Sequence, residues 1–342
     1  MTSSVAKTRM VTLASRPDGE PGPENFDVVT APVPELRDGQ LLVRNIYMSV
    51  DPAMRGRMET TEKHYTTNFT VGDPLDGSAV GEVIASTLPA VAVGSHVRHR
   101  LGWREHAVVD AATATPVDPS TAALPDWLGI LGQTGFTAYV GLTRAGRLAK
   151  GDTVFVSAAA GAVGSAAGQF ARLLGADRVI GSAGGPKKAR FLVDELGFDA
   201  GIDYRDDLSA GLDAAAPAGI DLYFDNVGGE HLVAALYALR ERGRVALCGM
   251  ISDMRDRDSS PAISHLIQAT LKRLTIQGFI VRDHEDLRAE FEATVSAWLR
   301  EGKVRSQATV STGIENAPDA FLSMLTGGNV GKALVQLSEE SA

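Results

Sequence analysis

The first third of the chain is a series of short hydrophobic runs broken by glycine, proline and aspartate. Apolar and β-branched residues dominate the runs "QLLVRNIYMSV", "SAVGEVIAS", "SHVRHR" and "REHAVVD". Runs of this length that are bounded by turn-forming residues are typical of β-strands rather than helices. This part of the sequence therefore predicts a compact β-barrel or β-sandwich.

Near Asp126 the pattern changes to hydrophobic runs that alternate with amphipathic stretches. Such alternation is typical of βαβ units, in which helices connect parallel strands. A last hydrophobic run, "KALVQL", could either extend this parallel sheet or return to the first domain, and periodicity leaves both open. The pattern predicts an α/β protein with two domains, and the strands expected in the second are residues 153–157, 178–182, 220–225, 243–248 and 274–281.

The length and the charge balance narrow the class of protein. The chain has 342 residues, of which 44% are hydrophobic and 22% charged. This size allows two domains with a large buried core, and the balance is that of a globular protein. A formal charge of −9, with lysines and arginines scattered along the chain, argues against a general nucleic-acid-binding protein. An anionic ligand would therefore need a local cationic site.

Cysteine content and hydropathy bear on the compartment. Cys248 is the only cysteine, which excludes an intrachain disulfide and every zinc site that needs two or more thiolates. The N-terminal stretch has no apolar core of signal-peptide length, and no later stretch is long enough to cross a bilayer. We therefore expect a cytoplasmic protein that is neither secreted nor inserted in a membrane.

A turn rich in small residues follows the first expected strand of the second domain. In "VFVSAAAGAVGSAAGQF", Ala159, Gly161 and Gly164 occupy the register of the G-x-G-x-x-G motif. Small residues there let the chain turn tightly, let backbone N–H groups approach a pyrophosphate, and let the helix lie close to the sheet. The alternative is a turn packed with small residues for steric reasons alone. The strand before it and the helix after it favour dinucleotide binding.

The next expected strand ends in "VIGSAGGPKK", where a site that prefers NAD usually carries Asp or Glu for the ribose hydroxyls. Neither acid is present. Ser182 and Gly184 leave space instead, and Lys187 or Lys188 can supply positive charge to a 2′-phosphate. We favour Lys188, because Pro186 is expected at the first helical position. NADP is thus predicted over NAD. The alternative is an ordinary solvated helix start, although cations there oppose the helix dipole.

The motif "DNVGG" lies where a third parallel strand is expected to end and a helix to begin. Ligands bind at the carboxyl ends of the strands in doubly wound sheets. Asn226 could therefore reach the ribose or nicotinamide side of a coenzyme. It could equally well cap the helix or form the turn.

Taken together, these stretches resemble the zinc-independent medium-chain dehydrogenase/reductases. The likeness is greatest to the group of prostaglandin reductases, leukotriene hydroxydehydrogenases, curcumin reductases and alkenal double-bond reductases. The resemblance covers most of the chain, and many ordered matches are more specific than any single motif. Besides the glycine-rich turn, the matching stretches are "NIYMSVDPAMRGRM", "LGQTGFTAYVGL", "GSAGGPKKARFLVDELGFDAGIDYR", "DLYFDNVGGEHL", "GRVALCGMIS" and "MLTGGNVGKALVQL".

The resemblance implies a fold, a coenzyme and an assembly. The fold would be a GroES-like β-barrel domain over residues 1–125, joined by residues 312–342, and a Rossmann domain with a doubly wound parallel sheet over residues 126–311. NADP(H) would lie in the cleft, and no metal is required. Homodimers are common in the group, so a homodimer is expected, whereas neither nucleic acid nor membrane is an expected partner.

The resemblance also extends the set of coenzyme contacts. For Tyr204 the alternative role is a strand-end aromatic that covers the sheet, and for Asn329 it is a turn former beside Gly328. With the turn and the lysine discussed above, the expected contacts are Ala159, Gly161, Ala162, Val163, Gly164, Ser182, Gly184, Lys188, Tyr204, Asn226, Cys248, Gly249, Ile251, Ser252, Phe279, Ile280, Val281 and Asn329.

The group reduces carbon–carbon double bonds that are conjugated to a carbonyl group. Hydride passes from the nicotinamide to the β carbon, negative charge develops on the carbonyl oxygen, and a proton completes the α carbon. A hydrogen-bond donor should therefore meet the developing enolate.

The chain departs from the group on the substrate side. Relatives usually carry a tyrosine two residues after the serine of the "G-x-I-S" turn, whereas this chain has Met254, whose thioether cannot donate a proton. Tyr65 matches a second family tyrosine and is the leading candidate donor, although it could be an exposed loop aromatic. Ser252 and His64 are weaker candidates. Gln133 and Thr134 stand where the group tends to have Met and Pro, and the expected substrate pocket comprises Met48, Tyr65, Gln133, Thr134 and Met254.

The sequence therefore predicts an NADPH-dependent ene-reductase acting on an enone, an enal or a related small hydrophobic molecule. One alternative is an NADPH:quinone oxidoreductase on the same fold. Another is an NADP-binding protein whose redox chemistry is altered or lost, which Met254 motivates.

Overall fold

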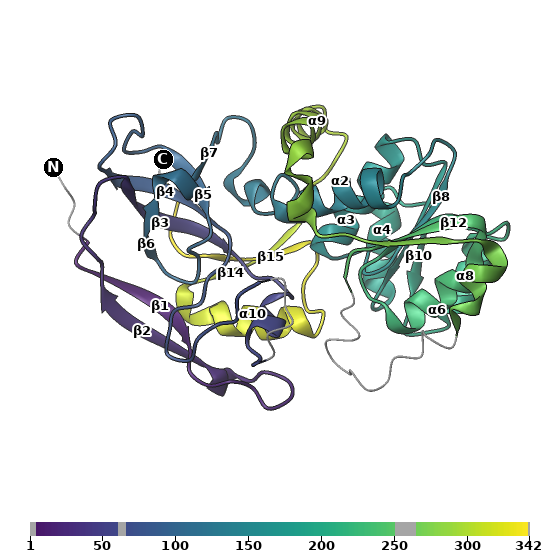
Figure 1. Ribbon diagram of the computed structural model, residues 1–342, viewed down its shortest axis with the longest axis horizontal. Helices are drawn as coiled ribbons and strands as arrows, with labels where there is room; N and C mark the ends of the chain where they lie inside the picture. The colour runs from purple at the N-terminus through teal and green to yellow at the C-terminus, as the bar shows by residue number, and fades with distance from the viewer. Residues whose placement is uncertain (1–4, 61–65, 250–264, 341–342) are drawn as a thin grey trace. The chain divides into compact units, whose positions relative to one another are not determined.

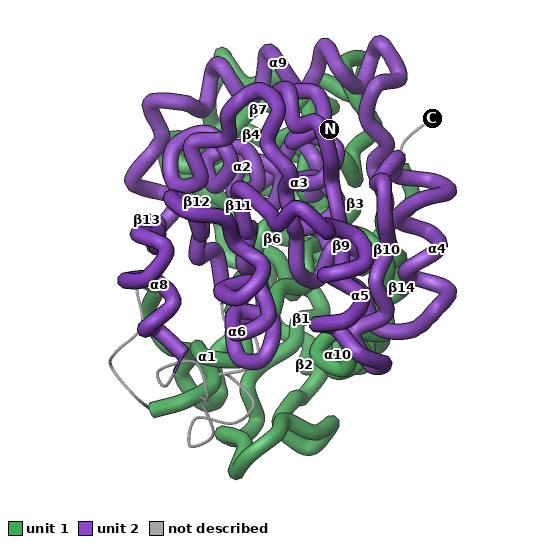
Figure 2. The backbone as a smooth tube through the Cα atoms, turned by 90° about the vertical axis from the view of Figure 1, so that its right-hand side faces the viewer, with its two compact units in different colours: residues 1–128, 308–342 green, residues 129–307 purple. Residues whose placement is uncertain are grey.

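The computed structural model describes residues 5–60, 66–249 and 265–340. The chain forms two compact units, residues 1–128 with 308–342 (unit 1) and residues 129–307 (unit 2), which Figure 2 colours separately. None of the helices in the described ranges has the length and apolarity that a bilayer span requires.

Unit 1 is built mainly from β-strands, as the short hydrophobic runs predict. A seven-stranded sheet has the order β14-β15-β3-β4-β5-β7, with β6 paired to β3, while β1 and β2 form a separate antiparallel pair. Its short helices are α1 (Met54–Arg57) and α10 (Ala317–Leu325). The strands are β1 (Lys7–Leu13), β2 (Phe26–Pro32), β3 (Gln40–Ser49), β4 (Ala79–Ser86), β5 (His96–His99), β6 (His106–Asp110), β7 (Thr115–Val117), β14 (Ala308–Thr312) and β15 (Lys332–Gln336).

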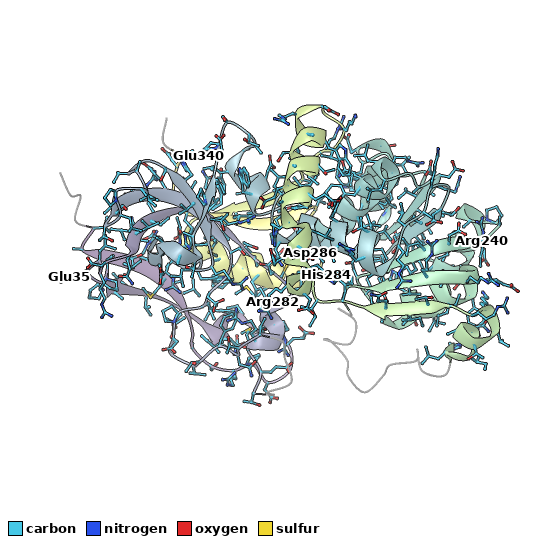
Figure 3. The ribbon with its side chains drawn as sticks, turned by 45° about the horizontal axis from the view of Figure 1, so that its top comes forward. Glu35, Arg240, Arg282, His284, Asp286 and Glu340 are labelled. Atoms are coloured by element: carbon cyan, nitrogen blue, oxygen red, sulfur yellow. The ribbon has the colours of Figure 1, made fainter. Side chains whose placement is uncertain are left out.

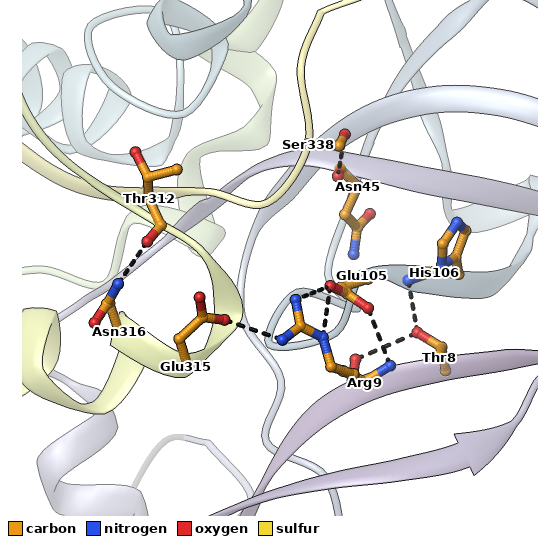
Figure 4. Close-up of polar contacts among 9 residues, drawn as sticks. All are labelled: Thr8, Arg9, Asn45, Glu105, His106, Thr312, Glu315, Asn316 and Ser338. Atoms are coloured by element: carbon orange, nitrogen blue, oxygen red, sulfur yellow. Dashed lines mark hydrogen bonds and ion pairs between the residues drawn. The ribbon is translucent and has the colours of Figure 1, made fainter.

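The end of the chain is part of this unit. β15 pairs antiparallel with β3 and parallel with β14, so "KALVQL" joins the first unit rather than the parallel sheet of unit 2. Phe321 of α10 packs edge-on against Phe26 and Trp103 in the core. Arg9 of β1 also reaches Glu105 and Glu315 at the surface (Figure 4). Contacts between residues about 300 positions apart therefore hold the unit together.

Unit 2 contains a six-stranded sheet whose described pairings are all parallel, in the order β10-β9-β8-β11-β12-β13. The central strand β8 reads TVFV and is buried throughout, which is typical of a strand covered on both faces. The strands are β8 (Thr153–Val156), β9 (Arg178–Ala183), β10 (Ala200–Asp203), β11 (Ile220–Asp225), β12 (Leu239–Leu247) and β13 (Thr275–Gly278).

Helices cover both faces of this sheet, which makes it doubly wound (Figure 1). α5 and α6 cover one face, where Leu212 and Leu236 pack against the strands. α3 and α4 cover the other face, since a Cβ at Gly181 of β9 would meet Leu192 of α4. The helices are α2 (Gln133–Val140), α3 (Ala162–Leu173), α4 (Pro186–Asp194), α5 (Leu208–Ala215), α6 (Gly229–Ala238), α8 (Ile267–Lys272) and α9 (Arg288–Arg300), with a π-helical turn η4 (Gly141–Ala145) and a 3-10 segment η6 (Val281–Leu287).

The five expected strands of unit 2 are confirmed, β10 was not expected, and two strand ends differ from the expectation by more than one residue. β12 begins at Leu239 rather than at residue 243, and its pairing with β11 shifts register between Ile220 and Leu222. β13 ends at Gly278 rather than at residue 281, because the chain leaves the sheet there and enters η6. A hydrophobic run shows that a segment can be buried, but its pairing partner decides where the strand stops.

Candidate functional site

The small-residue turn joins the end of β8 to the start of α3. Gly161 is the N-cap residue of α3, and no side chain caps the first turn. The first N–H groups of a helix have no hydrogen-bond partner within the helix. Those at the start of α3 can therefore donate to an anionic ligand. Gly161, Ala162 and Val163 are partly exposed. These three residues form the accessible part of the turn.

Two other members of the turn are occupied by the protein itself. A Cβ at Gly164 would lie 2.4 Å from the carbonyl oxygen of Ala158, so only glycine fits where the helix packs on its own turn. Ala159 is fully buried, and its N–H donates to the Ser182 carbonyl oxygen at 2.8 Å. The side chain of Ala159 is therefore a packing element, which is the steric role that the sequence left open.

The turn between β9 and α4 leads to Lys188, the expected contact of a coenzyme 2′-phosphate. Pro186 occupies the first position of α4 as predicted, and the first turn of the helix contains no acidic residue. Gly185, its N-cap, has φ +96°, a left-handed conformation that glycine adopts without strain. Lys188 is half-buried, and its pKa is lowered first by burial and then by the positive charge of Arg205. Positive charge is thus concentrated at this turn.

Ser182, at the end of β9, is a second sign of an incomplete site. Its side chain is fully buried, and in the described structure its hydroxyl has no hydrogen-bond partner. Buried hydroxyl groups are normally paired with protein or with ordered water. Together with the uncapped start of α3, this orphaned hydroxyl fits a turn that completes its hydrogen bonding when a polar ligand or water binds.

The end of β11 carries a hydrogen-bonded polar cluster. The Asp225 Oδ1 atom accepts hydrogen bonds from the Tyr223 hydroxyl at 2.7 Å and from the N–H groups of Val227 and Gly228 at 2.9 and 2.8 Å. Burial raises the pKa of Asp225, although these hydrogen bonds favour its charged form. Asp225 therefore holds the turn that begins α6.

Asn226 belongs to the same cluster. Its side-chain N–H donates to the Ser157 carbonyl oxygen at 2.8 Å, and its backbone N–H donates to the Ser157 hydroxyl at 2.9 Å. These bonds tie the end of β11 to the end of β8, which is the turn-forming role. The N–H groups of Cys248 and Gly249 both donate to the Asp225 carbonyl oxygen. Burial and the charge of Asp225 raise the pKa of the Cys248 thiol to about 12, so it is protonated at neutral pH.

Tyr204 follows β10 and lies over the turn that precedes α4. A Cβ at Gly184 would lie 3.0 Å from its hydroxyl oxygen. The ring is partly exposed and packs edge-on against His231 of α6, with ring centroids 5.1 Å apart. Burial lowers the pKa of His231 to about 4, so this imidazole is neutral at physiological pH. The sequence does not predict the contact between His231 and Tyr204, because nothing in "GGEHL" indicates it.

The start of α2 carries the two departures from the family pattern. Gln133 is its first residue, and its side-chain oxygen accepts a hydrogen bond from Arg288 at 3.3 Å. Arg288 stacks over Phe136 at 3.7 Å from the ring centroid, while the Thr134 hydroxyl donates to the Gly129 carbonyl oxygen. Arg288 thus controls the orientation of Gln133, and it could be identified only from tertiary contacts.

The segment from Phe279 to Val281 lies between β13 and η6. A Cβ at Gly141 would meet the Phe279 ring at 2.8 Å, so this ring packs on the π-helical turn after α2. An ion pair of 3.0 Å between Arg144 and Asp286 ties that turn to η6, on which Figure 3 labels Asp286. Ile280 is exposed.

In unit 1, two expected site residues have structural roles. Met48 is fully buried in the core, and its sulfur accepts a hydrogen bond from the Trp103 N–H at 3.1 Å. The Met48 side chain is therefore part of the core of unit 1. The Asn329 side chain donates to the Gly331 carbonyl oxygen at 2.7 Å and borders a pocket of about 420 Å³ beside β14 and α10.

Tyr65 and His64, as well as Ile251, Ser252 and Met254, lie outside the described residues. In the described ranges, no three His, Cys, Asp or Glu side chains come together as a metal ion would need.

Comparison with known proteins agrees with this arrangement. Residues 9–117 match the family described as the N-terminal domain of oxidoreductase, and residues 162–299 match the family described as zinc-binding dehydrogenase. The NADPH-dependent curcumin reductase of Escherichia coli is 37% identical over 97% of each chain. The NADP-dependent 2-alkenal reductase of Nicotiana tabacum is 39% identical over 90% of each chain. The crystal structure of Vibrio vulnificus CurA in complex with NADPH has a TM-score of 0.90 and 38% identity, covering 97% of this chain and all of that one.

This likeness extends over nearly the whole chain and includes both units. The protein belongs to the medium-chain dehydrogenase/reductase superfamily, in its zinc-independent curcumin and alkenal reductase group.

Proposed function

We propose that this protein is an NADPH-dependent ene-reductase that reduces the carbon–carbon double bond of small hydrophobic α,β-unsaturated ketones or aldehydes. The observation that carries the coenzyme assignment is the turn after β9, where Lys188 stands in place of an acid. Curcumin and 2-alkenals are the substrates in the names of two relatives with 37% and 39% identity, which supports the substrate class.

Residues of unit 2 supply the coenzyme contacts in this proposal. The N–H groups of Ala162 and Val163 in the first turn of α3 fit a pyrophosphate, because the positive end of a helix dipole favours phosphate. The ammonium group of Lys188, in a turn that carries no side chain at Gly184, fits an adenosine 2′-phosphate. Tyr204 is placed to cover the same turn.

The bound coenzyme would supply a hydride to the β carbon of the substrate. The protein must then provide orientation and a hydrogen-bond donor for the oxygen on which negative charge develops. A phenol with the ordinary pKa of about 10 is protonated at neutral pH and can fill that role. Tyr65 is the donor we propose from the sequence, with Ser252 as a weaker one.

Activity assays on a substrate panel test the proposal directly. NADPH absorbance should fall with enones and enals, and mass spectrometry should show products heavier by two hydrogen atoms in which the carbonyl group is intact. Loss of NADPH absorbance with quinones but not with enones or enals would favour the quinone reductase alternative. Inertness toward the whole panel would refute the proposal.

Two substitutions test the assigned roles. Lys188→Ala should weaken the binding of NADPH and leave the binding of NADH unchanged. Lys187→Ala changes the preceding residue, whose side chain is exposed, and should leave the affinities for both coenzymes unchanged. Equal losses for the two coenzymes would contradict the role of Lys188. Tyr65→Phe should lower turnover and spare NADPH affinity, and unchanged turnover would exclude Tyr65 as the donor.

A homodimer built on the edge of the parallel sheet is the assembly we propose. In the described structure β13 is an edge strand whose only neighbour is β12. Beside it lies a group of strongly exposed apolar side chains, which we name the apolar edge patch; it comprises Tyr237, Leu266, Ile267 and Leu271. Unpaired edges and apolar patches are normally protected in solution, and a second copy that pairs through β13 would cover both.

Sedimentation analysis tests this assembly. The wild type should have twice the chain mass of 36.0 kDa, and Leu271→Glu should shift it toward the monomer. Val193→Glu changes an exposed apolar residue of α4 away from the patch and should leave the dimer intact. A monomeric wild type would refute the proposal. We also propose the cytoplasm as the compartment, on the basis of the single cysteine.

A further inference from the structure

Two consecutive residues after β10 lie over two consecutive glycines after β9. A Cβ at Gly184 would lie 3.0 Å from the Tyr204 hydroxyl oxygen, and a Cβ at Gly185 would lie 3.6 Å from the Arg205 Nη1 atom. A side chain at Gly184 would crowd the phenol, and one at Gly185 would touch the guanidinium group, so the two glycines let the backbone of this turn lie close to Tyr204 and Arg205.

One carboxylate oxygen holds the two turns in this arrangement. Asp203 Oδ1 accepts a hydrogen bond from the Gly185 N–H at 2.8 Å and another from the Arg205 N–H at 3.1 Å. The backbone of Arg205 is therefore fixed relative to the start of α4. Because that oxygen is already bonded to two N–H groups, its charge is partly compensated by the backbone.

The positive charges of Lys188 and Arg205 repel each other. The charge of Arg205 contributes to lowering the pKa of Lys188, so the two cations are close enough to repel. A cation in the first turn of α4 also opposes the helix dipole. These effects favour an anion, whereas the net charge of the whole chain is −9.

Arg205 also differs from other arginines of unit 2. Arg172, Arg240 and Arg244 each form an ion pair with an aspartate. Arg205 is exposed and makes no ion pair with a carboxylate in the described ranges. Its guanidinium group is available to a ligand.

We infer that Arg205 is a second cationic ligand of the adenosine 2′-phosphate, acting together with Lys188 at the Gly184–Gly185 turn. A guanidinium group can donate two parallel hydrogen bonds to phosphate oxygens, which an ammonium group cannot match in geometry. Arg205 is thus a specificity-determining residue, and its role rests on the proposed NADPH dependence.

Binding measurements on the intact protein test this inference without any turnover. Calorimetry with adenosine 2′,5′-bisphosphate and adenosine 5′-monophosphate isolates the 2′-phosphate. Arg205→Gln should weaken binding of the bisphosphate, and of NADPH, by about tenfold, the lower end of what one charge-assisted hydrogen bond supplies. The monophosphate and NADH should bind as to the wild type. Arg205→Lys should retain part of the preference, since it keeps the charge and loses the paired geometry.

Arg190→Gln is the matched control, because Arg190 is an exposed arginine of α4 and its loss changes the net charge equally. It should leave all four affinities unchanged. The role of Arg205 is excluded if Arg205→Gln has no effect, if it weakens the bisphosphate and the monophosphate alike, or if Arg190→Gln has the same effect. A wild type that does not prefer NADPH to NADH would overturn the proposed coenzyme, and this inference with it.

Discussion

Acidification should destabilise unit 1 through a single buried histidine. His99 of β5 is 3% exposed, and its Nδ1 atom accepts a hydrogen bond from the Leu101 N–H at 3.0 Å. Nδ1 therefore carries no proton, and the Nε2–H donates to the Asn45 side-chain oxygen at 2.9 Å. The Asn45 amide in turn donates to the carbonyl oxygens of Leu101 and Arg104. Every group in this network is satisfied only while the imidazole is neutral.

The magnitude follows from the pKa of His99. Burial, assisted by the positive charge of Arg104, lowers it from 6.5 to about 3. Between these values the unfolded chain binds one proton more than the folded protein. The contribution of neutral His99 to the free energy of unfolding is therefore complete above the pKa of the unfolded state, and it is lost as the pH falls toward the pKa of the folded state. From pH 7 to pH 5 this single group should reduce the free energy of unfolding by about 2 kcal/mol.

Urea denaturation at pH 7, 6 and 5 measures this loss. The variant His99→Gln binds no proton at this position, so its free energy of unfolding should fall by about 2 kcal/mol less than that of the wild type over the same range. His96→Gln removes a partly exposed histidine of the same strand and should keep the wild-type pH dependence.

An unchanged pH dependence in His99→Gln would refute this reasoning. Because that variant removes a buried network and could fail to fold, NMR of the wild type labelled in its seven histidines gives an independent test. The His99 signal should not titrate above pH 4. Titration of that signal near pH 6 would show that the imidazole is not held neutral by its surroundings.

Two further predictions concern close packing and a buried ion pair. Gly164→Ala places a Cβ 2.4 Å from a backbone oxygen and should lower the free energy of unfolding by about 2 kcal/mol in thermal denaturation. In Gly161→Ala the nearest atom to the new Cβ lies 3.2 Å away, so this variant should fold normally, and coenzyme titration should show weaker NADPH binding. Lys332→Met should cost about 2 kcal/mol at pH 7 in urea denaturation, because Lys332 is buried, its Nζ lies 2.6 Å from Asp51 Oδ1, and its loss leaves a partly buried carboxylate without its cation. Burial raises the pKa of Asp51, but the charge of Lys332 outweighs this and lowers it, so the contribution of the pair should disappear as the pH falls below about 4.

The sequence alone determined the local elements and their class. Alternating hydrophobic and amphipathic stretches predicted the parallel sheet, because a strand buried on both faces needs a continuous apolar run such as TVFV. Pro186 began α4 as expected, since its fixed φ and missing N–H suit a first helical position. Resemblance to a family added the coenzyme and the reaction, because a long ordered set of motifs identifies a fold better than any single pattern does.

Only the tertiary structure decided which sheet β15 joins, since "KALVQL" is hydrophobic enough for either and its pairing with β3 involves residues nearly 290 positions away. It also placed Met48 in a core and brought Arg205 over Gly185. Local periodicity predicts none of these contacts, because it indicates only whether a side chain can be buried. Which neighbours surround it depends on contacts between distant segments, and these exist only once the chain has folded.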